Sequence, residues 1–148
     1  MTRVSPKIIK ASIISGSVYY FREEQLSSNE PHYFIVLNLN PKTDEVIILA
    51  CASHQIEKTK KRRSNCPKET LIIITPKQYC DFPKLSIIDC NRIIPLNIHQ
   101  IMSKYEHNAL DVKTEMDIML VEKIRQGILA SPQIQPRIKQ MLQTTLDA

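Results

Sequence analysis

A chain of 148 residues can bury a hydrophobic core of its own, so we expect residues 1–148 to form a single domain. Only two glycines are present, Gly16 and Gly127, which excludes the glycine-rich loops that hold phosphates in many nucleotide-dependent enzymes. No stretch reaches the ~18 apolar residues of a membrane span, and no secretory leader is recognisable, so we expect a cytoplasmic protein without a membrane partner.

The four cysteines, at positions 51, 66, 80 and 90, contain no Cys-x-x-Cys pair, and the four histidines are scattered. Free thiols are therefore expected, with neither a metal site nor a cofactor. A redox or metal-binding protein that uses these cysteines remains a third hypothesis for the function.

The net charge of +5 comes from one short segment. Residues 58–63 carry five positive charges, and the rest of the chain has fifteen basic and fifteen acidic side chains. We expect this segment to be an exposed basic loop, since charge runs are usually solvated.

The N-terminal half of the chain has the composition of β-strands. Residues 16–21 are a β-branched and aromatic run that begins at a glycine, and residues 25–31 have the composition of a loop. Two apolar runs, at residues 32–38 and 45–51, flank a short turn at residues 40–44, which predicts a β-hairpin.

Two further strands are expected before residue 95. Residues 69–75 are a continuous apolar run, typical of a strand that is covered on both faces or lies at a subunit interface. Residues 85–90 provide the last strand and extend towards residues 93–94. About five strands with short connections predict a mainly β fold, with a small closed barrel over about residues 15–95.

The C-terminal third changes to the helical period. A short helix is predicted over residues 97–105, and a longer one begins near the capping signal at Thr114 and ends near residue 129. Another start signal at Ser131 indicates a terminal helix. We therefore expect two to three helices over about residues 97–146.

The order of these motifs resembles the PemK/MazF family of toxin endoribonucleases. Residues 16–20 match the family's opening Gly, acidic, aliphatic and aromatic pattern except at Ser17, and residues 32–38 match a Val/Ile-rich strand that ends in Gln or Asn. Residues 50–58 stand where the family has a Thr/Ser-containing motif, and a C-terminal helix follows. The similarity covers about residues 15–130.

This resemblance implies an SH3-like barrel with C-terminal helices, usually a homodimer, that cleaves single-stranded RNA without a metal and is inhibited by a small antitoxin protein. The family's Thr/Ser position falls on Ser53. The family's Arg position, before the second strand, falls on Pro31 or His32, so the Arg itself is missing.

Three residues are candidates for catalysis. Cleaving RNA without a metal needs a base for the 2′-hydroxyl, an acid for the leaving 5′-oxygen, and donors that stabilise charge on the phosphorus. His32 and His54 suit the proton transfers because imidazole titrates near neutral pH, and Ser53 suits a hydrogen bond to a phosphate oxygen. The structural alternative is that His32 caps a loop, His54 is a solvated turn residue, and Ser53 bonds its own backbone.

Positive side chains near Ser53 are candidates for contacts with the RNA backbone. Asp89 and Asn91 either read a base edge or cap the end of a strand. The candidate RNA-binding residues are Lys58, Lys60, Lys61, Arg62, Arg63 and Asn91. An acidic antitoxin tail is an equally suitable partner for the same cations.

The loss of the family Arg leaves a second interpretation of the function. In this interpretation the chain keeps the PemK/MazF-like fold but is catalytically inactive, and it serves as a binding module for RNA or a protein partner. In either case we expect a homodimer, because residues 71–74 and the helical stripes offer more apolar surface than a small barrel covers.

Overall fold

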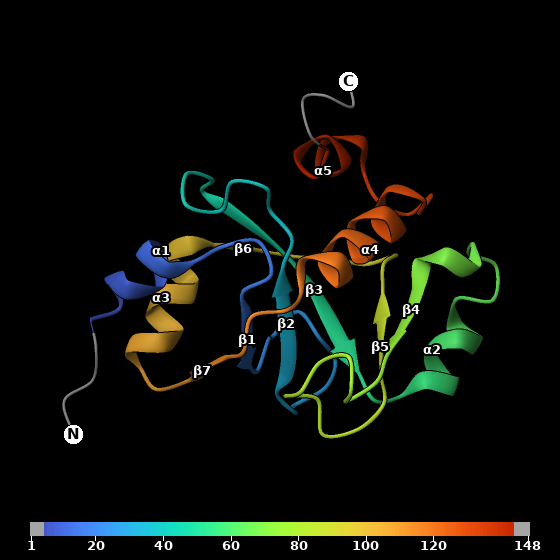
Figure 1. Cartoon of the computed structure of the whole chain (residues 1–148), viewed down its shortest axis with the longest axis horizontal. Helices are drawn as coiled ribbons and strands as arrows, with labels where there is room; N and C mark the ends of the chain where they lie inside the picture. Colours follow the sequence, from blue (N-terminus) through green and yellow to red (C-terminus); the bar gives the residue numbers. More distant parts are fainter. Residues whose placement is uncertain (1–4, 144–148) are drawn as a thin grey trace.

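The computed structural model describes residues 5–143, whose arrangement is shown in Figure 1. These residues form seven strands: β1 (Val18–Phe21), β2 (His32–Val36), β3 (Val46–Ser53), β4 (Leu71–Ile74), β5 (Ser86–Asp89), β6 (Ile94–Asn97) and β7 (Leu110–Lys113). The helices are α1 (Lys7–Ser12), α2 (Ile56–Arg62), the 3-10 helix η1 (Lys68–Thr70), α3 (Ile98–Glu106), α4 (Ile118–Leu129) and α5 (Pro136–Met141). The fold is mixed α/β, with more helix in its first half than the sequence indicated.

All seven strands belong to one antiparallel sheet, in which six follow the order β4-β5-β3-β2-β1-β7 and β6 pairs with β3 beside this path. The long strand β3 pairs with β2 along one edge and with both β6 and β5 along the other. Within residues 5–143, β4 and β7 form the two ends of this order, so the sheet is not closed into a barrel. The expected closed barrel of about five strands was therefore wrong, and so was its boundary near residue 95, since β7 returns after α3 to pair with β1.

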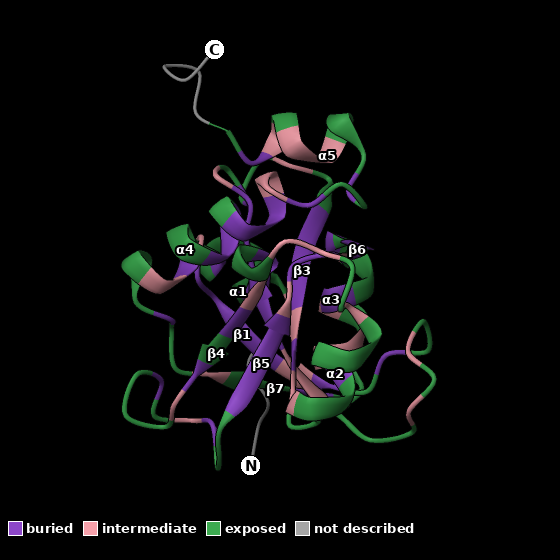
Figure 2. Cartoon of the chain, turned by 90° about the vertical axis from the view of Figure 1, so that its right-hand side faces the viewer, coloured by how far each residue is buried: buried purple, intermediate pink, exposed green. Residues whose placement is uncertain are grey.

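The sheet buries apolar side chains on both faces. Against one face lie α4 and α5, and against the other lie α1 and α3 (Figure 1). Because side chains alternate along a strand, β3 contributes Ile48 and Ala50 to the first core and Ile47 and Leu49 to the second. Figure 2 shows β3 and β5 as almost continuously buried, while the outer surfaces of the helices are exposed.

The predicted hairpin is confirmed, and a buried asparagine fixes its register. Asn38 is fully buried, and its Oδ1 accepts a hydrogen bond of 2.6 Å from the backbone N–H of Ile48. Its side-chain nitrogen donates to Oδ2 of Asp44 and to the carbonyl of Val46, both at 2.9 Å. These bonds hold the turn and thereby set which residues face each other at the opposite end of β2 and β3.

The helices after β6 lie close to their predicted positions. Asn97 caps α3 with a capping box, as the helix predicted over residues 97–105 requires. The α4 helix starts later than expected, because Asp117, and not Thr114, accepts the capping bond. The terminal helix begins with Pro136 at its first position, several residues after Ser131, and the part of its predicted range beyond residue 143 lies outside the described residues.

The basic segment is a helix, which corrects the predicted loop. Lys, Arg and Glu are good helix formers, and α2 places three cations in its last turn, where they interact favourably with the helix dipole. Thr59 is buried, and its hydroxyl donates to the carbonyl of Gln55 at 2.8 Å. The charge run therefore lies on a fixed element that packs against β5.

Candidate active site

The hairpin brings His32 and Ser53 to facing positions at the end of the sheet. The last paired residues of β2 and β3 are Tyr33 and Ala52, so His32 and Ser53 stand one position further along the same register. Alternation puts both side chains on the face opposite to those of Tyr33 and Ala52. Two of the residues predicted for catalysis therefore come together through backbone pairing alone.

His32 and Ser53 line a cavity of about 170 Å³ on this face. Its walls come from the loop after β1, from β2 and β3, from α2, and from β5 with the turn that follows it. The lining residues are Leu26, Ser27, Ser28, His32, Cys51, Ser53, Gln55, Thr59, Arg62, Ile87, Asp89 and Arg92. One histidine, one carboxylate and two guanidinium groups thus line the same space.

A second, larger cavity of about 420 Å³ adjoins the first around the end of the strands. Four residues border both cavities: Ser28, His32, Ser53 and Gln55. His54, the third predicted catalytic residue, lines only the larger one. The two cavities form a groove with His32 and Ser53 where they meet.

The ring of His32 is oriented by the loop that precedes β2. Its Nδ1 lies 2.9 Å from the backbone carbonyl oxygen of Glu30. A carbonyl oxygen only accepts hydrogen bonds, so Nδ1 carries a proton, and in the neutral imidazole Nε2 is the basic nitrogen. The half-buried His32 is thereby held in the tautomer that a general base requires.

The hydroxyl of Ser53 has one fixed contact. Its Oγ accepts a hydrogen bond of 3.1 Å from the backbone N–H of Gln55, which is the turn-forming bond that the structural alternative anticipates. That bond uses only a lone pair, and among residues 5–143 no acceptor takes the hydroxyl proton. Ser53 therefore both shapes the turn and retains a donor.

His54 is exposed and contacts Ser86. Its Nδ1 lies 3.2 Å from Oγ of Ser86, which is also 3.1 Å from the carbonyl of Lys84. The hydroxyl of Ser86 has a single proton. When Ser86 donates it to the carbonyl of Lys84, its oxygen accepts from a protonated Nδ1; when Ser86 donates it to His54, the acceptor is an unprotonated Nδ1. Both tautomers and the protonated form of His54 therefore have a partner here.

Of the five basic residues at positions 58–63, only Arg62 lines the small cavity. Its Nη2 lies 3.7 Å from Oδ2 of Asp89, and its side chain is 56% exposed. The neighbouring Arg63 donates through Nε to the same carboxylate oxygen at 2.8 Å and is only 22% exposed. Asp89 thus fastens the end of α2 to the sheet and leaves Arg62 accessible.

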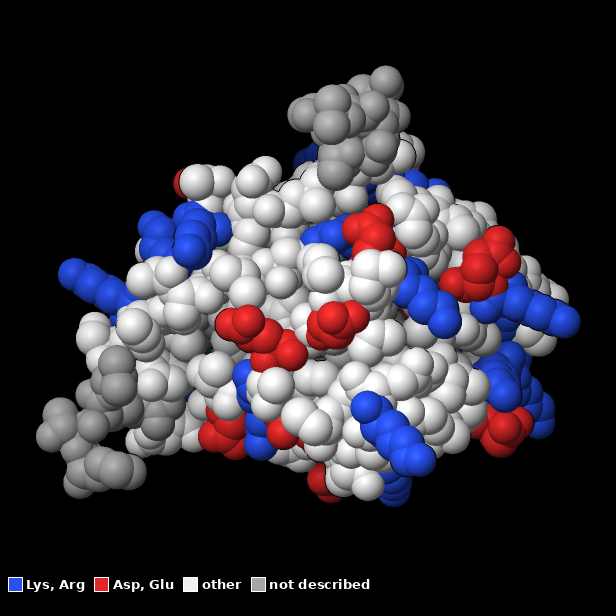
Figure 3. Space-filling view, in the orientation of Figure 1, with Lys and Arg blue, Asp and Glu red and all other residues white. Residues whose placement is uncertain are grey.

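The three lysines of α2 are exposed, and only Lys60 has an ion-pair partner, Glu57 at 3.8 Å, among the residues described. Figure 3 shows basic side chains, with acidic ones beside them, at the right-hand edge of the molecule, where Figure 1 places α2. Lys58, Lys60 and Lys61 therefore form an outer cationic surface and do not line either cavity.

Arg92 is the functional candidate that the sequence did not reveal. It lies in the turn after β5, lines the small cavity, and donates from Nη2 to the backbone carbonyl of Gln25 at 2.7 Å. This bond ties the loop after β1 to the cavity. No local sequence pattern marks Arg92, and the fold alone brings its guanidinium group to the cavity that His32 and Ser53 line.

Asn91, in contrast, has a structural position. It is 4% exposed, and its side-chain nitrogen donates to Thr70 Oγ1 at 2.9 Å and to Asp89 Oδ1 at 3.1 Å. Its side-chain oxygen accepts from Ser131 at 2.7 Å. These contacts leave Asn91 no free group for a nucleic acid, and we leave it out of the site.

Cys51 forms part of the floor of the small cavity. Burial raises the pKa of its thiol to about 12, against the smaller opposing effect of Arg92. The thiol is therefore protonated at neutral pH and is a poor nucleophile. All four cysteines are free.

No protein-family model matches the chain, and no curated protein matches it. Across residues 5–143, His, Cys, Asp and Glu side chains do not gather in groups of three that could hold a metal ion. In the same part of the chain, every helix is too short or too polar to cross a membrane.

Proposed function

We propose that the protein is an endoribonuclease of the PemK/MazF type, which cleaves single-stranded RNA without a metal ion. The observation that carries the proposal is the meeting of His32, Ser53 and Arg92 at one cavity, although they come from separate segments of the chain. Their imidazole, hydroxyl and guanidinium groups supply the proton transfer and charge stabilisation that cleavage of a phosphodiester needs.

In the proposed reaction, the 2′-oxygen of a ribose attacks the adjacent phosphorus. Nε2 of His32 takes the proton from the 2′-hydroxyl, the O2′–P bond forms, and the P–O5′ bond breaks. The imidazolium of His54, which lines the larger cavity together with His32, gives its proton to the leaving 5′-oxygen. The products are a 2′,3′-cyclic phosphate and a 5′-hydroxyl.

Charge that develops on the non-bridging phosphate oxygens needs donors that are already in place. The free proton of the Ser53 hydroxyl and the guanidinium groups of Arg62 and Arg92 have this role in the proposal. Arg92 takes the part of the family arginine. Asp89 limits the freedom of Arg62 through their ion pair, which keeps that side chain close to the cavity.

The partners in the proposal are RNA and a small acidic antitoxin in the cytoplasm. The exposed Lys58, Lys60 and Lys61 extend the positive charge of the cavity along α2. A flexible acidic segment that covers this surface would exclude RNA from the groove by occupying the same cations. Inhibition through electrostatic competition of this kind weakens as salt is added.

We also propose a homodimer with an SH3-like arrangement of strands. Strand β4 supports the dimer because it lies at an outer edge of the sheet and exposes Ile73, which is 36% accessible. The pairing of β3 with β6 and β5 along one edge supports a strongly coiled sheet of the SH3-like kind. Light scattering that gives the mass of one chain would contradict the dimer.

The catalytic proposal is tested by the rate at which purified variants cleave single-stranded RNA of mixed sequence. His32→Ala should be roughly 10²–10⁴-fold slower, because a general base is lost. Ser53→Ala and Arg92→Gln should each be roughly 10²–10³-fold slower, because a donor to the transition state is lost. The exposed His99 on α3 provides a matched control, and His99→Ala should cleave at the wild-type rate.

Circular dichroism of each variant separates loss of chemistry from loss of folding. Equal rates for the wild type and all three site variants would remove these residues from catalysis. If the folded wild type binds RNA but does not cleave any of a broad set of sequences, the chain is the inactive binding module.

A further inference from the structure

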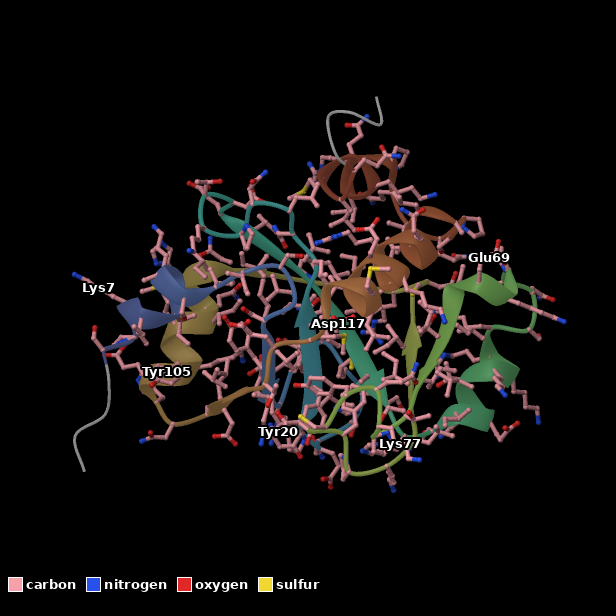
Figure 4. All side chains as sticks on the ribbon, viewed as in Figure 1. Lys7, Tyr20, Glu69, Lys77, Tyr105 and Asp117 are labelled. Carbon is pink, nitrogen blue, oxygen red and sulfur yellow. The ribbon has the colours of Figure 1, made fainter. Side chains whose placement is uncertain are left out.

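The larger cavity has an aromatic wall that the proposed chemistry does not use. Tyr20 and Tyr33 face each other across β1 and β2, with ring centroids 4.6 Å apart and planes inclined by 40°. Both are half-buried and both line this cavity. In Figure 4, Tyr20 lies at the lower end of the sheet.

The two rings are held in place before any ligand arrives. Tyr33 packs edge-on against the buried Phe82, with centroids 5.2 Å apart, and Phe82 packs in turn against Tyr79. Nζ of Lys113 lies 5.4 Å from the ring centroid of Tyr20. A rigid aromatic surface costs little conformational entropy when it binds a flat ligand.

The tyrosines lie on the opposite face of the sheet from His32 and Ser53, because neighbouring residues of a strand alternate in direction. The larger cavity therefore passes around the strand ends and joins the two faces. A nucleotide whose phosphate contacts His32 and Ser53 has its base directed around this end, towards the rings.

Polar groups at the same cavity match the edge of a base. The side chain of Gln55 borders both cavities, and its amide has no hydrogen-bond partner among residues 5–143. Lys84 and Glu30 also line the larger cavity, and the positive charge of the lysine offsets the negative charge of the carboxylate. An amide presents one donor and one acceptor group, which suits hydrogen bonds to a base edge.

We propose that this cavity holds one unpaired base next to the cleaved phosphate, stacked against Tyr20 and Tyr33, with Gln55 contacting the base edge. This subsite rests on the proposed function and gives it a physical reason for acting on single strands: a base in a duplex has no free face for stacking.

The subsite is tested by binding short single-stranded 2′-O-methyl RNA, which cannot be cleaved, in a fluorescence anisotropy titration. Abasic residues are introduced at each position in turn. For the wild type, one abasic position should weaken binding by roughly tenfold, since a stacked base contributes about that much. Tyr20→Leu and Tyr33→Leu should bind the intact strand more weakly and lose the sensitivity to that abasic position, whereas Tyr20→Phe and Tyr33→Phe should keep it.

Gln55→Ala should change which of the four bases binds best at that position, while Gln140→Ala, at an exposed glutamine on α5, should not. A wild type that binds no strand, or tolerates an abasic residue at every position, would overturn the subsite. So would leucine variants that are folded and keep the abasic effect. His32→Ala should retain the abasic effect in full, so this test of the subsite is independent of whether the protein cleaves RNA.

Discussion

Gly127→Ala should destabilise the protein, although alanine is the better helix former. Gly127 lies inside α4, where a Cβ atom would meet Sγ of the buried Cys90 at 2.7 Å and the carbonyl oxygen of Glu69 at 3.0 Å. Overpacking of a core costs about 1–3 kcal/mol, and we place this site in the upper half because both obstacles are fixed. Replacing a helical glycine by alanine returns about 1 kcal/mol. The net loss should be about 1–2 kcal/mol.

The assay is urea unfolding followed by circular dichroism, with a double-mutant cycle through Cys90→Ala. Removing Sγ frees the space for the new methyl group, so Gly127→Ala should cost at least about 1 kcal/mol less in the Cys90→Ala background. Lys123→Ala, at an exposed position of the same helix, provides the control and should leave stability nearly unchanged. The reasoning is refuted if Gly127→Ala costs the same in both backgrounds, or if it stabilises the wild type.

Further predictions concern buried polar groups and thiols. Arg125→Met should lower the free energy of unfolding by about 1–3 kcal/mol. The buried guanidinium group donates to the Leu37 carbonyl at 2.9 Å, and its loss leaves that acceptor unpaired. An unchanged urea midpoint would contradict this. Burial raises the pKa of the Cys51 and Cys90 thiols from 9.0 to about 12, so their contribution to stability should be complete below pH 9 and lost as the pH rises through about 12. Thermal unfolding across this range checks the sign, and a rise in stability would refute it. In native protein near neutral pH, a thiol reagent should label the exposed Cys80 first and Cys90 only on unfolding; rapid labelling of Cys90 would show that this core is open.

The hairpin was predictable because two independent local signals agreed. Apolar runs on both sides of a short turn indicated the pairing of β2 and β3, and this pairing alone places His32 opposite Ser53. The helices α3 and α4 were predictable for a similar reason, since apolar spacing and a capping residue coincide there.

The elements that escaped prediction have weak apolar patterns. Both β7 and α1 are short, four and six residues long, which gives too few apolar positions to establish a period in the sequence. The α2 helix contributes only Thr59 to the interior and is held to the sheet by ion pairs with Asp89. Its charge run suggested a loop because these tertiary contacts leave no periodic signal.

The candidate site was predictable only in part, for the same reason. Pairing between neighbouring strands follows from the chain order, and it accounts for His32 and Ser53. The position of Arg92 depends on how the turn after β5 folds back towards the loop after β1, where Arg92 donates to the carbonyl of Gln25. Contacts between such distant loops follow from the whole fold.

The most direct test of the central claim is the chemistry of the cut ends. Mass spectrometry of the products formed by the wild type in the presence of EDTA should show a 2′,3′-cyclic phosphate on one fragment and a 5′-hydroxyl on the other. A substrate with a single 2′-deoxyribose at the cleaved position should remain intact at that position, because the attacking oxygen is missing. Fragments that end in a 3′-hydroxyl and a 5′-phosphate, or cleavage at the deoxyribose, would contradict the acid–base mechanism assigned to His32 and His54.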